Sequence, residues 1–326
     1  MSSAPSFRPG DLAVDVADRC GLVAAWTSAV LSGRVAPDLA MSALRHTGGP
    51  LAGSVDAGRH QLLEEDFDLR DPTGGAPDPG PTADPTTRST SGATAGTGPA
   101  DVAGLAGLLA LCRRLGVDRL WCAPAAAGDT SLLPGPPELN AAAVDVGGAV
   151  LLSGSSLALV PALTEHGPAD DRVHRLNWRL STRAVRTAPG GEAPPGPSLA
   201  EADRALLVAL EDAVTALDHL DVAAFDPHSE GLRRGDRAAL LPPGAPQRAG
   251  LVRDRALVVL RAVDLAGRSE GAAVSASAMA GRSAALRPAA AAARAALAAA
   301  WNAAPVTTGP GAVSVPAPDR VPRTAR

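Results

Sequence analysis

The stretch DVAGLAGLLALCRRLGVDRLWCAPAAAGDTSLLPGPPELNAAAVDVGGAVLLSGSSLALVPAL, residues 101–163, decides the fold. It opens with apolar residues at steps of three or four, which predict a helix over 101–115 that is capped by Gly116. Two short apolar runs, 149–152 and 157–160, predict a hairpin pair of strands joined through 153–156. A helix and strands that follow one another this closely indicate a packed core of helices and sheet.

Between these elements the sequence predicts one more strand and one more helix. The strand covers 117–122, and we expect it to end at Pro124, because proline cannot continue a central ladder. The helix covers 137–146, with Pro137 in its first turn and Gly147 closing it.

Toward the N-terminus, apolar periodicity predicts helices over 11–31 and 35–44 that pack as an antiparallel hairpin, with Trp26 as the core anchor. His60 and Glu64 are four residues apart and share a face if this segment is helical. The acidic run at 64–68 is then interpreted as solvated charge at a helix end. Beyond the central stretch, 173–180 alternates apolar and polar residues and predicts an edge or half-exposed strand.

The C-terminal third is predicted to be helical. Ser198 and Glu201 form a capping box, which begins a helix of about six turns. Two further helices are predicted over 247–265 and 274–303, the last interrupted or kinked at Pro288.

The predicted fold class is an α+β N-terminal domain, a small mixed sheet with helices, followed by an all-α C-terminal helical bundle. The first domain spans 10–187 and contains a disordered insertion at 71–100, whose Pro, Gly, Ser and Thr cannot bury enough surface to offset the entropy of ordering. A linker at 188–197 leads to the helical domain at 198–304, and a disordered tail covers 305–326.

Composition excludes several classes of function. A net charge of −4 and only 2% aromatic residues argue against nucleic-acid binding, because neither a basic field nor stacking platforms are present. The chain has no lysine and no tyrosine, which excludes Schiff-base and phosphate-loop lysines and phenolic acid/base catalysis.

Cysteine usage and hydropathy bear on the compartment. The three cysteines are far apart in sequence and odd in number, which indicates reduced, buried thiols in a cytoplasmic protein; the alternative is that Cys112 and Cys122 meet in space. No segment approaches the ~20 continuous apolar residues of a membrane span, so no membrane partner is expected.

Three segments approach known catalytic or binding motifs, and each lacks a required residue. Gly48 to Gly53 has the spacing of a phosphate loop, but Ser54 stands where the lysine is required. Residues 154–158 resemble the Gly-x-Ser-x-Gly nucleophile elbow of hydrolases, but Ala158 stands in place of the second glycine. His60 and Glu64 lack a third metal ligand. We therefore predict no catalytic residue, no metal and no cofactor.

The remaining candidate is the loop from Gly128 to Asn140. Its prolines and glycines restrict the backbone beyond a strand end, where open α/β sheets tend to bind ligands. The predicted ligand-binding residues are Asp129, Thr130, Glu138 and Asn140. The alternative is purely structural, with Asp129 and Thr130 forming a turn and Glu138 lying at a helix N-terminus.

The runs LPGPPELNAAAVDVGGAVLL, LALVP, SLAEADRALLVAL and ALRPAAAAARAALAAAWNAA resemble an uncharacterised family of actinobacterial proteins. The resemblance covers most of the chain outside 71–100 and the two termini. It implies no activity, cofactor or site residue.

These observations favour a protein of unknown function that is a non-catalytic cytoplasmic binding or regulatory protein, with an unknown small molecule or a protein as its partner. The alternative is an enzyme of unrecognised class that uses the carboxylates of the 128–140 loop as acid/base groups. A third interpretation is a homo-oligomer held by Ala-rich helix faces.

Overall fold

The computed structural model describes residues 12–46, 61–68, 104–133, 135–166, 173–181, 196–220, 241–268 and 276–303. The predicted insertion at 71–100, the tail at 305–326, the tested phosphate loop at 48–53 and His60 lie outside the described residues, as does most of the linker at 188–197.

Two neighbouring helices open the fold, α1 (Ala13–Leu31) and α2 (Pro37–His46). Both were predicted, and Pro37 is the first residue of α2, where its missing N–H costs nothing. Nearly every side of α1 is buried, and Trp26 is only 3% exposed, so it is a core anchor as expected. A helix that is buried on nearly every side lies in the middle of its domain.

The sheet has five strands in the order β1-β5-β4-β3-β2, with bounds β1 (Gln61–Asp68), β2 (Leu120–Pro124), β3 (Gly148–Leu152), β4 (Ala158–His166) and β5 (Val173–Ser181). The four strands from β2 to β5 are antiparallel to their neighbours, whereas β1 pairs parallel to β5. The predicted mixed sheet and the 149–160 hairpin are confirmed.

Two further helices flank the sheet strands in sequence, α3 (Leu105–Leu115) and α4 (Pro137–Val146). Both end as predicted, at Gly116 and Gly147, which adopt left-handed φ angles of 65° and 103°. A Cβ at Gly147 would also meet the backbone of Ala13 at 2.3–2.8 Å, so this glycine lets α4 end close beside the start of α1.

One local prediction was wrong: residues 61–68 form strand β1, which pairs with β5, and not the end of a helix. The strand predicted over 117–122 begins at Leu120 and ends at Pro124, as expected. β5 lies inside the sheet between β1 and β4, and its buried residues alternate with more exposed ones from Leu176 to Ser181, as expected for a half-exposed strand. The last helix is not interrupted at Pro288, which lies inside it.

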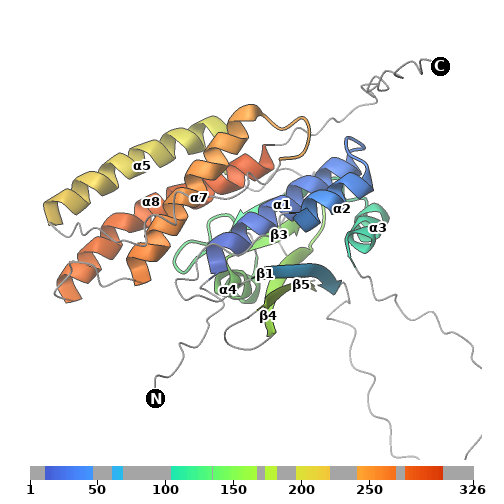
Figure 1. Cartoon of the computed structure of the whole chain (residues 1–326), viewed down its shortest axis with the longest axis horizontal. Coiled ribbons are helices and arrows are strands. Elements are labelled where there is room, and N and C mark those ends of the chain that lie inside the picture. The colour runs from blue at the N-terminus through green and yellow to red at the C-terminus, as the bar shows by residue number, and fades with distance from the viewer. Residues whose placement is uncertain are drawn as a thin grey trace, which may run out of the picture.

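The two faces of the sheet carry different layers. Side chains of Leu120, Cys122 and Val150 share one buried cluster with α1 and α3. Trp121 and Leu151 point the opposite way and share a second cluster with residues of α4 and the loop before it. Figure 1 shows α1 on one side of the strands and α4 on the other.

Three long helices complete the chain, α5 (Leu199–Leu220), α7 (Gln247–Arg268) and α8 (Ala276–Asn302). The capping box is confirmed: the Glu201 carboxylate accepts from the Ser198 backbone N–H at 2.9 Å, and the Glu201 N–H donates back to Ser198 Oγ at 3.4 Å. α8 lies between α5 and α7 (Figure 1). Its buried face is mostly alanine, which lets its neighbours approach closely.

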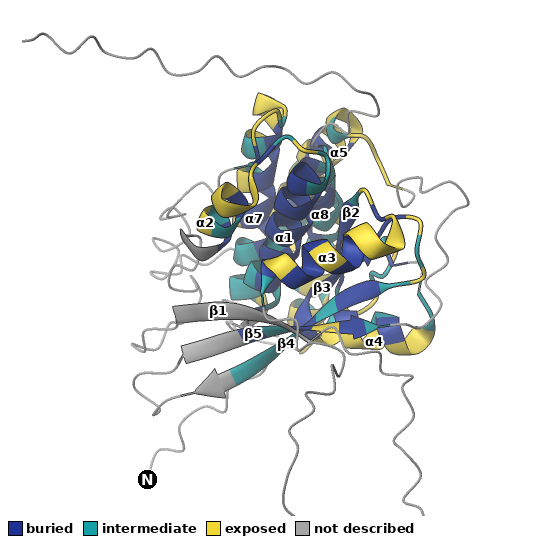
Figure 2. Ribbon diagram, turned by 90° about the vertical axis from the view of Figure 1, so that its right-hand side faces the viewer, coloured by how far each residue is buried: buried dark blue, intermediate teal, exposed yellow. Residues whose placement is uncertain are grey.

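One hydrophobic core joins the sheet region and the long helices. Its cluster includes Trp26 of α1, Trp178 of β5 and Trp301 of α8, each at most 3% exposed. Figure 2 shows buried residues gathered where α1, α8 and the sheet meet. The C-terminal half of α8 is therefore as much a part of the sheet's support as of the helical region.

Candidate functional site

The loop before α4 begins with a tight turn. Ala126 and Asp129 exchange two backbone hydrogen bonds of 3.1 and 2.9 Å, and Gly128 supplies the left-handed φ of 78° that the turn needs. The Asp129 carboxylate accepts from Arg294 Nε of α8 at 2.7 Å and from Ser131 Oγ at 3.0 Å. Asp129 thus joins the loop to the long helices.

The other three predicted site residues lie farther along the same segment. The Thr130 carbonyl accepts from the Leu133 N–H at 2.9 Å, which makes a second turn. Glu138 lies exposed in the first turn of α4, where its charge complements the helix dipole. Asn140 also lies in α4, and its buried Oδ1 accepts no hydrogen bond from the residues that the structure describes.

Sequence reasoning missed a buried ionic cluster between α1, α7 and α8. The Arg253 side chain is 6% exposed and donates from Nε to Asp18 Oδ1 at 2.8 Å and from Nη1 to Asp254 at 2.8 Å. Trp301 Nε1 donates to the same Asp18 oxygen at 2.9 Å, and the guanidinium lies 5.2 Å from the Trp301 ring centroid. Burial opposes the charge on Arg253, but Asp18 and Asp254 outweigh it and raise its pKa.

A second pair lies one turn away along α1. Arg261 Nη2 donates to Asp15 Oδ1 at 2.9 Å, and the two side chains are 20% and 13% exposed. Burial raises the pKa of Asp15, although Arg261 acts in the opposite direction. Part of each pair could have been found from the sequence, because Asp15 and Asp18 interrupt an otherwise apolar helix. The sequence does not show that their partners are Arg261 and Arg253.

The outer edge of β2 is closed by side chains. The Leu120 N–H donates to Ser28 Oγ of α1 at 2.8 Å. The Asn302 amide of α8 pairs with Cys122, accepting from its N–H at 2.9 Å and donating to its carbonyl at 3.0 Å. Pro124 has no N–H to satisfy. Another chain cannot add a strand here without displacing these helices.

The three cysteines are free and buried. Burial raises the pKa of Cys112 to about 12, and burial, with Cys20 and Asp18 nearby, raises that of Cys122 well above its ordinary value. Cys122 therefore neighbours Cys20, and it forms no disulfide with Cys112. High pKa values keep these thiols protonated and poorly nucleophilic.

The exposed surface of the long helices carries apolar side chains. We call this surface the α5–α7 seam: Leu207 and Val214 of α5 are 48% and 57% exposed, and Leu251 and Val258 of α7 are 65% and 45% exposed. At one end of it Asp203, on α5, accepts from Arg248 at 2.7 Å and also from Arg255, both on α7. Leu207 follows Asp203 by one turn and Leu251 lies between the two arginines in sequence, so the apolar residues flank the point where the helices meet.

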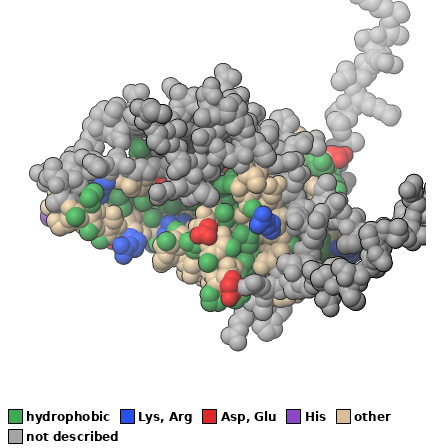
Figure 3. All heavy atoms as spheres, turned by 90° about the horizontal axis from the view of Figure 1, so that it is seen from below, with side chains coloured by type: hydrophobic (Ala, Val, Ile, Leu, Met, Phe, Trp, Pro, Cys, Tyr) green, Lys and Arg blue, Asp and Glu red, His purple; other side chains and the backbone are tan. Residues whose placement is uncertain are grey.

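Charged side chains elsewhere are mixed in sign. On the face seen in Figure 3, Arg and Asp or Glu side chains are scattered singly among apolar and small ones. Within the described ranges, no group of three or more His, Cys, Asp or Glu is placed to hold a metal ion. In the same part of the chain, no helix is long and apolar enough to cross a membrane.

Two family models match the chain. The Rv1486c-like protein, N-terminal domain, covers residues 20–192, and the Rv1486c-like protein, C-terminal domain, covers residues 200–298. No curated protein and no solved structure matches it.

Proposed function

The chain belongs to the Rv1486c-like protein family, and we propose that it acts as a non-catalytic binding or regulatory protein that engages a protein partner through the α5–α7 seam. The observation that carries this proposal is the exposure of four aliphatic side chains, Leu207 and Val214 on α5 and Leu251 and Val258 on α7. Aliphatic side chains exposed together on neighbouring helices are typical of a surface that binds another protein.

The chemistry of the seam favours a helical partner. Leu207 and Val214 are seven residues apart, as are Leu251 and Val258, so each pair lies on one face of its helix. This spacing suits an apolar helix laid along the seam, with charged residues at its sides.

The framework beneath the seam supports a binding role. Asp203 joins α5 to α7, Arg253 joins α7 to α1, and Asp129 joins the 128–140 loop to α8. These charged side chains therefore hold elements in place, which presents the seam on a fixed scaffold. We propose the cytoplasm as the compartment, because the three cysteines are free and buried.

Photo-crosslinking in cells tests the proposal. A photoreactive amino acid placed at 251 or 214 should give a discrete adduct of higher mass. The same group at 39 serves as the matched control, because Leu39 is 51% exposed but lies on α2. Adducts from 251 and 214 but not from 39 support the seam. Equal patterns at all three positions, or no adduct from either seam position, would show that the proposal is wrong.

A further inference from the structure

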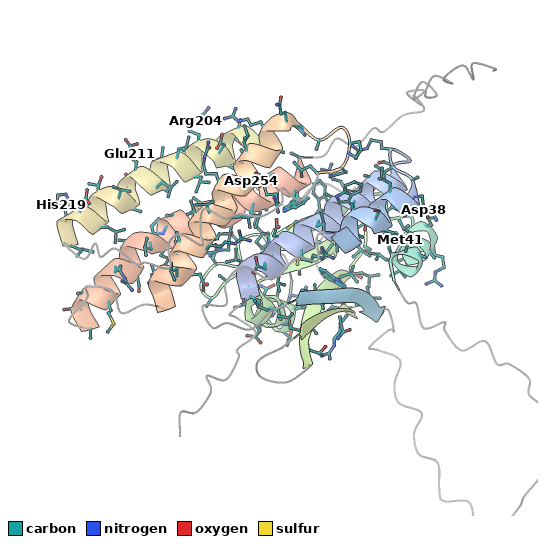
Figure 4. All side chains as sticks on the ribbon, in the orientation of Figure 1. Asp38, Met41, Arg204, Glu211, His219 and Asp254 are labelled. Carbon is teal, nitrogen blue, oxygen red and sulfur yellow. The ribbon has the colours of Figure 1, made fainter. Side chains whose placement is uncertain are left out.

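We draw no further inference here: the strongest candidate, the exposed surface of α5 on which Arg204, Glu211 and His219 lie (Figure 4), belongs to the same helix as the seam already described, and nothing in the structure shows which molecule covers it.

Discussion

Asp18 is the residue on which the interior depends most. It accepts hydrogen bonds from Arg253 and from Trp301, and so connects α1 to both α7 and α8. A buried charge pair adds little net stability when complete, because desolvation offsets the attraction. Removing one partner is costly, since the other charge is then left buried without compensation.

Arg253→Ala should therefore lower the free energy of unfolding by about 3–5 kcal/mol. Arg248→Ala is a matched control, since Arg248 also pairs with an aspartate but its side chain is 57% exposed. Exposed pairs are worth about 1 kcal/mol or less. Urea unfolding followed by circular dichroism measures the free energy of unfolding of both variants. Losses of similar size would contradict the role assigned to the buried cluster.

Cys112 makes a pH-dependent contribution. Burial raises its pKa from 9.0 to about 12, so the folded chain keeps a proton that the unfolded chain releases above pH 9. This contribution is fully present below pH 9 and is lost as the pH rises toward the folded pKa. The free energy of unfolding should fall by about 1.4 kcal/mol between pH 8 and 10 on account of this thiol alone.

Cys112→Ala tests this assignment, because it removes the thiol together with its share of the pH dependence. The variant is expected to be less stable at pH 8, yet its stability should decline less between pH 8 and 10. A decline as steep as that of the wild type would mean that Cys112 is not responsible.

The sequence shows which residues carry charge, but it does not show which of them form ion pairs. Asp129 stays a predicted ligand-binding residue, and its ion pair with Arg294, 165 positions away, could not be predicted. Asp18 and Arg253 are 235 positions apart. No local pattern encodes contacts over such distances. The seam was missed for a related reason: α5 and α7 each read as amphipathic, and only their packing on α8 shows which apolar residues stay exposed.

At the scale of elements, Gly21 lets α1 pack against the Trp301 ring of α8. A Cβ there would lie 2.0 Å from Cδ1 of Trp301, well inside any tolerated contact. The glycine therefore lets the indole reach Asp18. Close helix contacts of this kind are also what the alanines of α8 provide along the rest of its length.

Gly21→Ala should destabilise the fold by about 1–3 kcal/mol through overpacking against a buried ring. Gly267→Ala is the control, since among the described residues no atom beyond its own stretch of helix lies within 4 Å of the added Cβ, and alanine favours a helix. It should be neutral or stabilising by up to about 1 kcal/mol. Thermal melting of both variants gives the comparison, and a neutral Gly21→Ala would contradict the packing described here.

Elements defined by local signals were predicted well, and those defined by their partners were not. The helices of the long C-terminal region follow from apolar periodicity and from the Ser198 capping box. Strand β1 was missed because its acidic residues suggest a solvated helix end, and only pairing with β5 makes it a strand. Pro124 ends β2 as predicted, because its missing N–H cannot continue the ladder.

At the scale of the whole molecule, two matched family domains share one core. Trp301 lies beyond the C-terminal match, which ends at residue 298, and it packs beside α1 of the N-terminal region. The long helices are thus fixed to the sheet by buried charge and by an aromatic anchor. This arrangement leaves the α5–α7 seam on the outside.

The central claim is that a partner covers this seam, and the rate at which a thiol at position 251 is labelled in cells tests it most directly. The native cysteines are buried, so an introduced surface cysteine dominates the reaction. Leu251 is 65% exposed and Leu39 51%, so an uncovered Leu251→Cys should react at least as fast as Leu39→Cys. We predict that it reacts several-fold more slowly in cells and recovers in dilute purified protein. Equal or faster labelling under both conditions would contradict the account.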